Sequence, residues 1–294
     1  MKLEIQTVSW KIKNIFFNSL LYNELSEVKK LSEGQEAEIF ILIIESEYKC
    51  IIKKWRKGFR VNVKKQFAFL EKGLLSGLPV PFPYTWGIDE NGVQYLVMSY
   101  AGSTIKTPSD NQMKLLASVL SSIHQSSFTL NEVKNECNLF NEMINDYFPS
   151  LDTQSDIANL IQQLKNEIPI RKPTLIHGDF NLGNVLFREK EITVIDWTNA
   201  RIGDFRYDFS WAYFLLWLYS GEKPSCIFAD TYKSLLNYTV IPLEFESFEC
   251  IAALRWLLLN RLFSLPQGIE KQELVKRFIK ERIPERLGGD FDVY

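Results

Sequence analysis

The segment from Ile176 to Trp197 constrains this chain more than any other, because it gathers chemically versatile side chains around one short hairpin. It reads IHGDFNLGNVLFREKEITVIDW, and the members that matter are His177, Asp179, Asn184 and Asp196. The apolar runs VLF and ITVI flank a charged turn at 189–191, a pattern that predicts two antiparallel strands. We expect this hairpin to bring Asn184, before its first strand, together with Asp196, after its second.

This set of side chains suits the transfer of a phosphoryl group. Such a reaction needs a carboxylate beside the attacking hydroxyl and oxygen ligands that hold magnesium on the nucleotide phosphates, since catalysis is mostly positioning and charge neutralisation. Asp179 can supply the carboxylate, while Asn184 and Asp196 carry the hard oxygen ligands that magnesium prefers. A purely structural turn is the alternative interpretation, and the ordered set argues against it more strongly than any single residue does.

The segment resembles the aminoglycoside phosphotransferase and choline kinase family, small-molecule relatives of the protein kinases, whose pattern is HGDxxxxN followed by IDW or IDF. The stretch ARIGDFRYDFS at 200–210 extends this likeness, because it is similar to the GDPxxDLA stretch of that family. Phe205 stands where the family usually has proline. The likeness extends thinly over roughly residues 30–220, and the helices beyond it match only in character.

The resemblance implies a protein-kinase-like bilobal α+β fold, with a small antiparallel β lobe plus one helix and a larger, mainly helical lobe. It implies ATP as phosphate donor and Mg²⁺ as cofactor, bound between the lobes. Asp179 would be the catalytic base, with Asn184 and Asp196 as metal ligands. His177 would fix the loop, and Asp208 would brace it from the following helix. For His177 a satisfied structural histidine is favoured over a proton-transfer role.

The pattern along the chain predicts two lobes. We place a nucleotide-binding lobe at 1–98, a hinge at 99–102 and a catalytic and substrate-binding lobe at 103–294. Apolar runs separated by short turns predict strands over 26–54. After the hinge the pattern becomes helical, beginning with a capping box at Ser109.

A helix is expected over 60–76, because apolar residues recur there at helical spacing and the prolines of GLPVPFP end it. Beyond it, QYLVMSY has the character of one more buried strand.

The nucleotide end carries weaker signals. No GxxxxGK[ST] stretch is present, which excludes a Walker-type phosphate loop. SEGQEA at 32–37 lies where the family has its phosphate loop and has one glycine, Gly34, so an ordinary hairpin turn is the alternative. Lys53 is the expected phosphate contact, since it shares a strand face with Ile51 while Lys54 points to the opposite face. A solvated lysine pair is the alternative.

The expected glutamate partner of Lys53 departs from the family pattern. The first half of the helix offers Gln66 but no acid, and Glu71 is the only acid farther along. The helix is therefore shifted in register, or Gln66 substitutes weakly, or the lysine is held in another way. The backbone groups of Ser99 and Ala101 are expected to pair with the adenine edge, an assignment that depends on their position alone.

The short step between two of the acids favours a small acceptor. Only residues 197–207 separate Asp196 from Asp208, which leaves no room for the long activation segment that presents peptides in ordinary protein kinases. We therefore expect a hydroxyl of an aminoglycoside-, choline- or sugar-like molecule as acceptor. The alternatives are an atypical protein kinase of the Bud32 or RIO kind, which GQEAEIF and KKWRKGFR resemble, and a nucleotide-binding pseudokinase.

Two further patterns bear on the acceptor. Four acids suggest a pocket for a cationic substrate, although a solvated helix face is the more common role of such a run: Glu132, Glu136, Glu142 and Asp146. Aromatic side chains in FSWAYFLLWLY suggest a cage for quaternary ammonium. These aromatic residues lie all round one helix, which makes core packing the favoured role.

Composition limits the partners. Lys plus Arg is 34 against 36 for Asp plus Glu, a net charge of −2 that gives no whole-chain attraction to nucleic acid or anionic membrane. The four cysteines form no CxxC pair, so neither a zinc site nor a disulfide framework is indicated. The N-terminus lacks the apolar core of a secretory signal, and the longest apolar run, 209–219, is too short to span a bilayer. We expect a cytoplasmic protein.

Overall fold

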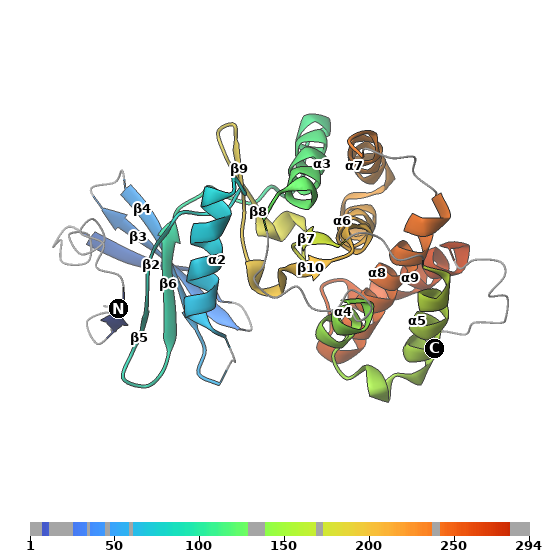
Figure 1. Ribbon diagram of the computed structural model, residues 1–294, viewed down its shortest axis with the longest axis horizontal. Helices are drawn as coiled ribbons and strands as arrows, with labels where there is room; N and C mark the ends of the chain where they lie inside the picture. The colour runs from blue at the N-terminus through green and yellow to red at the C-terminus, as the bar shows by residue number, and fades with distance from the viewer. Residues whose placement is uncertain are drawn as a thin grey trace. The chain divides into compact units, whose positions relative to one another are not determined.

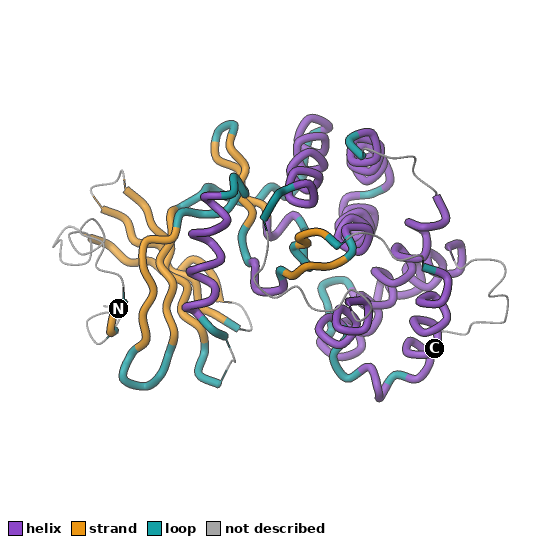
Figure 2. Tube along the Cα trace, in the orientation of Figure 1, coloured by secondary structure: helices purple, strands orange, loops and turns teal. Residues whose placement is uncertain are grey.

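The computed structural model describes residues 8–11, 26–33, 36–44, 48–58, 61–128, 139–168, 173–236 and 242–282 (Figure 1). The chain forms two compact units, Met1–Ser103 with Leu186–Thr198 and Thr104–Val185 with Asn199–Tyr294. Figure 2 shows strands concentrated in the first unit and helices in the second. The predicted α+β class, a small antiparallel sheet with one helix and a larger helical part, is confirmed. The lobe boundaries and the hinge at 99–102 stay predictions.

A six-stranded sheet of order β1-β5-β6-β4-β3-β2 forms the first unit, and all its pairs are antiparallel. Its strands are β1 (Ser9–Trp10), β2 (Ser26–Glu33), β3 (Ala37–Ile44), β4 (Tyr48–Trp55), β5 (Pro83–Ile88) and β6 (Gln94–Ser99). Alternation places Phe40, Ile52 and Val97 in one buried cluster, because β3 pairs Phe40 with Ile52 and β4 pairs Ile52 with Val97. The strands predicted over 26–54 are confirmed, whereas β5 was missed because prolines lead into it.

Helix α2 (Val63–Leu75) belongs to the same unit as the sheet. It begins at Asn62, whose side chain accepts a hydrogen bond from the backbone N–H of Lys65 at 3.0 Å. Its buried face contains Phe67 and Leu70. The predicted helix is confirmed, with its start three residues later than expected because Asn62 supplies the cap.

Seven helices are described in the second unit: α3 (Asp110–Gln125), α4 (Leu139–Tyr147), α5 (Ser155–Glu167), α6 (Phe205–Ser220), α7 (Glu222–Ser234), α8 (Pro242–Phe263) and α9 (Gly268–Arg282). The capping box predicted at Ser109 forms with Gln112. Helices α6 and α8 are apolar on most of their surface and are buried accordingly, for example at Phe214 and Phe248. No described helix is long and apolar enough to cross a membrane.

Short strands and one-turn helices make up and flank the motif segment at 176–197. β7 (Thr174–Ile176) pairs antiparallel with β10 (Arg201–Gly203), and the one-turn helix η4 (Leu182–Asn184) follows the loop after β7. The predicted hairpin is confirmed as β8 (Val185–Arg188) and β9 (Glu191–Val194). The one-turn helix η5 (Trp197–Asn199) comes after β9, and η3 (Leu151–Thr153) precedes α5.

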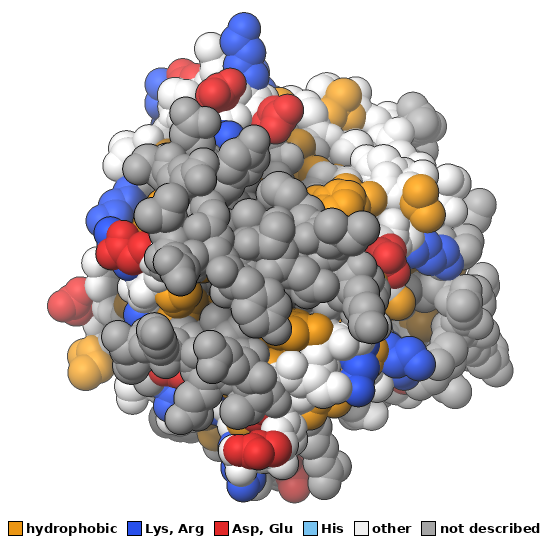
Figure 3. All heavy atoms as spheres, turned by 90° about the vertical axis from the view of Figure 1, so that its left-hand side faces the viewer, with side chains coloured by type: hydrophobic (Ala, Val, Ile, Leu, Met, Phe, Trp, Pro, Cys, Tyr) orange, Lys and Arg blue, Asp and Glu red, His pale blue; other side chains and the backbone are white. Residues whose placement is uncertain are grey.

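On the face in Figure 3, described acidic and basic side chains are interspersed, in keeping with the net charge near zero.

Gly102, which follows β6 and lies against Phe187 of the hairpin, gives a first prediction. Its φ of +103° lies in the left-handed region, and a Cβ there would collide with the carbonyl oxygen of Phe187. Gly102→Ala is expected to lower the free energy of unfolding by more than about 2 kcal/mol, measured by urea denaturation. The matched change Gly92→Ala, at φ +78° with open space around it, should cost only about 1 kcal/mol of backbone strain. Equal losses in the two variants would contradict the collision.

Candidate active site

The loop that follows β7 is held by one buried carboxylate. Asp208 lies in the first turn of α6 and has no solvent exposure. It accepts hydrogen bonds from the backbone N–H groups of His177 at 2.7 Å and Gly178 at 2.8 Å. These contacts attach the start of the loop to α6, so the conformation of residues 177–179 depends on the charge of Asp208.

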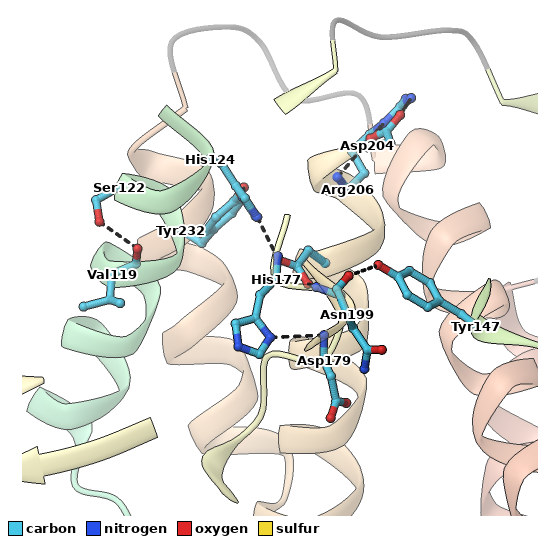
Figure 4. Close-up of polar contacts among 12 residues, drawn as sticks. Val119, Ser122, His124, Tyr147, His177, Asp179, Asn199, Asp204, Arg206 and Tyr232 are labelled. Carbon is cyan, nitrogen blue, oxygen red and sulfur yellow. Dashed lines mark hydrogen bonds and ion pairs between the residues drawn. The ribbon is translucent and has the colours of Figure 1, made fainter. Parts of the chain in front are cut away.

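Asp208 also contacts His124, a side chain of helix α3. The Nε2 atom of His124, on α3, lies 3.1 Å from Asp208, and its Nδ1 lies 2.6 Å from the hydroxyl of Tyr232, on α7 (Figure 4). With Nε2 donating to the carboxylate, Nδ1 of a neutral ring accepts from Tyr232. Burial raises the pKa of Asp208, but the hydrogen bonds from His124 and from the His177 backbone outweigh it and hold the pKa below its usual range.

His177 serves the loop backbone. Its ring is fully buried, its Nδ1 accepts a hydrogen bond from the backbone N–H of Asp179 at 3.2 Å, and its edge packs against Phe180. Figure 4 shows the ring beside the Asp179 backbone, with the Asp179 carboxylate pointing away from it. A ring nitrogen occupied in this way fits the structural role favoured from the sequence.

The Asp179 carboxylate is oriented by two donors. Trp211 on α6 donates from Nε1 to Oδ1 at 2.8 Å, and Asn184 donates from Nδ2 to Oδ2 at 3.2 Å. The same Nδ2 donates to the Asp179 carbonyl at 2.9 Å. The structure therefore brings Asp179 and Asn184 together, and because both contacts use the amide nitrogen, they leave the Asn184 oxygen for another partner.

A buried arginine that the sequence did not flag completes this region. Arg255 on α8 is 6% exposed and donates to the Gly178 carbonyl at 2.9 Å and to the Tyr207 hydroxyl at 2.7 Å. Its guanidinium lies 4.2 Å from the ring centre of Trp211. Burial disfavours its charge, but the nearby Tyr207 and Asp179 outweigh this and raise its pKa, so Arg255 stays cationic.

The sequence carried one signal that was overlooked. Arg255 is the single charged residue in the apolar run IAALRWLLL, and a charge inside such a run needs a buried partner. The Trp211 donor was missed for a different reason, because a tryptophan on an apolar helix has the same pattern whether or not its N–H finds a carboxylate.

In the first unit, Lys53 and Asp196 form an ion pair. The Lys53 Nζ lies 2.9 Å from Asp196 Oδ1, and the Lys53 side chain is only 13% exposed. Thr198 donates to the same oxygen at 2.9 Å. Asp196 has φ +60°, a left-handed conformation that is uncommon for residues other than glycine and that clusters at functional sites.

Lys53 is therefore paired with Asp196 and not with Glu71, the glutamate of helix α2. Glu71 lies on α2 with an exposed side chain and forms no ion pair with Lys53, and Gln66 is half-buried on the same helix. Lys54, on the opposite face of β4, approaches Glu38 at 3.8 Å. Of the three possibilities left open by the sequence, the pairing of Lys53 with Asp196 realises the third.

The remaining predicted positions are only partly described. The Ser99 N–H donates to the Phe82 carbonyl at 2.8 Å, so a nucleotide contact from Ser99 would use its carbonyl oxygen. Ala101 follows two residues later and is half-buried. Gly34 lies outside the described residues, as do Glu132 and Glu136.

A divalent cation fits the donor set only with outside ligands. Among the described residues, no group of three or more His, Cys, Asp or Glu side chains is placed to hold a metal. Asn184 and Asp196 offer hard oxygens, and magnesium commonly takes one or two protein oxygens with the rest from phosphates and water. Each of the two side chains, Asn184 in the second unit and Asp196 in the first, thus offers the kind of oxygen that a nucleotide-bound cation takes.

Comparison with known proteins agrees with this geometry. Residues 27–236 match the phosphotransferase enzyme family. No curated protein sequence matches the chain. The likeness inferred from the HGDxxxxN pattern is thereby confirmed.

Solved structures share the fold over nearly the whole chain. Amicoumacin kinase hAmiN, solved with AMP-PNP, Ca²⁺ and Ami, is 17% identical, with 91% of each chain covered and a TM-score of 0.64. Aminoglycoside phosphotransferase APH(4)-Ia is 15% identical, with 94% of this chain and 98% of that one covered and a TM-score of 0.67. Choline kinase LicA from Streptococcus pneumoniae is 17% identical, with 91% and 98% covered and a TM-score of 0.63. These likenesses show a protein-kinase-like fold.

The Asp208 contacts predict a pH-dependent loss of stability. Asp208→Asn should lower the free energy of unfolding by about 3 kcal/mol or more at pH 7, because the buried N–H groups lose a charged acceptor. The contribution of a group whose folded pKa is lowered is complete above about pH 4 and disappears as the pH falls through the folded pKa. The difference between wild type and variant should therefore shrink below pH 4 in urea titrations. Asp230→Asn, at an exposed acid on α7, is the control and should change stability by less than about 0.5 kcal/mol.

Proposed function

This chain belongs to the phosphotransferase enzyme family, and we propose that it transfers the γ-phosphate of ATP to a hydroxyl group of a small molecule. The observation that carries this proposal is the Asp179 carboxylate, which Trp211 and Asn184 hold by separate oxygens. A carboxylate oriented in this way can direct an attacking hydroxyl and accept its proton.

The proposed phosphoryl transfer forms one bond, breaks one bond and moves one proton. The acceptor oxygen forms a bond to the γ-phosphorus while the bond from that phosphorus to the leaving oxygen of ADP breaks, and the hydroxyl proton passes to Asp179. Since this chemistry depends on position and charge, the main task of the protein is to fix Asp179. Asp208 and Arg255 support that task, because they hold the backbone of His177 and Gly178 immediately before it.

We assign the donor end to residues of the family pattern. Asn184 and Asp196 would be the ligands of Mg²⁺, which when bound neutralises charge on the nucleotide phosphates. Lys53 would contact those phosphates, and its short ion pair with Asp196 supports this role, since it keeps a cation beside the predicted metal ligand. Ser99 and Ala101 would offer backbone groups to the adenine edge.

A small acceptor is favoured over a peptide. Residues 197–207 consist of η5, the three-residue strand β10 and the start of α6, a connection too short to present a peptide. Relatives of the same fold include an amicoumacin kinase and a choline kinase, both of which act on small molecules by their names. Retention of Asp179, Asn184 and Asp196 argues against a pseudokinase, because degenerate sites lose such groups.

The division of roles predicts different losses in two variants. Asp179→Asn should lower kcat by about 10²-fold to 10⁴-fold while ATP affinity stays within twofold, because the substitution removes the proton acceptor but no nucleotide contact. Asp196→Ala should abolish turnover and also weaken Mg²⁺-dependent nucleotide binding. The measurements are ATP consumption with a panel of hydroxyl metabolites and calorimetric titration of AMP-PNP with and without Mg²⁺. Equal loss of nucleotide affinity in both variants would contradict the assigned roles of Asp179 and Asp196. A lack of acceptor-dependent turnover in wild type would refute the proposed enzyme activity.

Removal of the Trp211 hydrogen-bond donor should cause a purely catalytic defect. Trp211→Phe keeps an aromatic ring on α6 but removes the donor to Asp179, so kcat should fall roughly tenfold to a hundredfold with KM for ATP unchanged. Trp217→Phe is the matched control on the same helix, since its ring packs against Phe278 at 4.5 Å and it has no contact with Asp179. Steady-state kinetics of both variants give the comparison, and similar kcat values in the two would refute a role for the indole N–H.

A further inference from the structure

Two of the four acids that suggested a cationic acceptor lie in the described residues, and both contact one arginine. Glu142 and Asp146 on α4 both contact the guanidinium of Arg201 on β10, Glu142 at 3.1 Å. Arg201 also lies over the ring of Tyr147 at 5.9 Å. The guanidinium offsets one of the two negative charges and holds both carboxylates, which weakens their attraction for a ligand cation.

The aromatic side chains of α6 are also occupied. Arg255 covers the ring of Trp211 at 4.2 Å, and the Lys271 ammonium lies 5.2 Å from the ring centre of Tyr219. Trp217 packs against a phenylalanine of α9. A cage for quaternary ammonium needs open ring faces, and cations of the protein itself take the faces of Trp211 and Tyr219.

An apolar cavity lies beside the catalytic loop instead. It has a volume of about 260 Å³ and is lined by loop residues 180–183, by Leu116 of α3 and by Ala212, Leu215, Leu216 and Tyr219 of α6. Four of its nine lining residues are leucines, and Phe180 and Ala212 add further apolar surface. Such a surface favours a hydrocarbon group over a charged one, because a charge would lose its hydration without gaining a partner.

Two residues of the cavity wall are the sequence neighbours of Asp179 and of its hydrogen-bond donor Trp211. Phe180 directly follows Asp179, and the Asn181 side chain donates to the Asp179 carbonyl at 3.0 Å. On the other wall, Ala212 directly follows Trp211, whose indole donates to the Asp179 carboxylate. Both sides of the cavity are therefore one residue away from the groups that orient the attacking hydroxyl.

The size of the cavity limits what it holds. An apolar cavity of about 150 Å³ accommodates benzene, whereas sites for whole drug-sized ligands span about 300–1,000 Å³. A cavity of about 260 Å³ thus accepts one substituted ring or branched alkyl group, and not an entire polycationic oligosaccharide. The rest of the acceptor, including its hydroxyl, must lie outside it.

We propose that this cavity binds an apolar ring or branched alkyl substituent of the acceptor and so selects neutral alcohols that carry such a group beside the phosphorylated hydroxyl. The inference rests on the proposed function, since it takes Asp179 as the group that meets the hydroxyl. It adds a specificity determinant, of which Leu215 is a half-buried member on α6.

The test compares two probes with the same hydroxyl groups. Benzyl β-D-glucoside and methyl β-D-glucoside are titrated without nucleotide, by calorimetry, into wild type, Leu215→Gln, Leu215→Trp and Leu115→Gln. Wild type should bind the benzyl compound at least about tenfold more tightly, the gain expected from burying a phenyl group. Leu215→Gln makes the wall polar and Leu215→Trp fills the space, so each should reduce the preference below threefold. Leu115 is the exposed neighbour of Leu116, and Leu115→Gln should keep the full preference.

Thermal unfolding of each variant ensures that a lost preference comes from a folded protein, and a Leu215 variant that fails to fold leaves the decision to the other. Equal affinity of the two glucosides for wild type overturns the inference, as does a preference that survives both Leu215 changes. Phosphate transfer with ATP is measured separately on both glucosides and on kanamycin, a polycationic aminoglycoside. Transfer at equal kcat/KM to all three also overturns the cavity's role while leaving the proposed function intact. A benzyl preference in binding without transfer to any acceptor overturns the proposed function instead.

Discussion

The second unit is organised around the charge of Asp208. A carboxylate without solvent contact is stable only when its oxygens are satisfied, and here two backbone N–H groups and the His124 ring supply the donors. Those donors come from the loop after β7 and from α3, while Tyr232 of α7 holds the other side of the His124 ring. One ionised group therefore fixes three helices and the start of the loop relative to one another, and the geometry at Asp179 follows from it.

Arg255 balances this arrangement from the opposite direction. Its guanidinium donates to the Gly178 carbonyl, whereas Asp208 accepts from the Gly178 N–H, so the peptide groups on both sides of Gly178 are fixed by buried charges of opposite sign. The Trp211 ring lies under Arg255 and its N–H reaches Asp179. Rotation of the Asp179 side chain would break that bond and leave an indole N–H buried without a partner, which makes the observed rotamer costly to leave.

The sequence predicted the parts of this protein that depend on local pattern. Strand alternation, the capping box at Ser109 and the hairpin after Asn184 all depend on residues within a few positions of one another. The family pattern also identified Lys53, although not its pairing with Asp196, because an ion pair between positions 143 residues apart depends on the folded chain. Arg255 was missed for the same reason, since nothing near it in the sequence indicates that its partner is the loop at Gly178.

The same limit applies to the acidic and aromatic side chains that the sequence connected with the acceptor. A sequence shows that Glu142 and Asp146 share a helix, but not that Arg201 arrives from β10 to pair with them. It shows an aromatic helix, but not that Arg255 and Lys271 cover two of its rings. The cavity that includes Phe180 and Ala212 has a mainly apolar lining, and in the proposed function such a wall would exclude water that competes with an alcohol for the phosphoryl group. In the proposed function, the choice of acceptor therefore depends on how the whole unit folds and not on the catalytic motif alone.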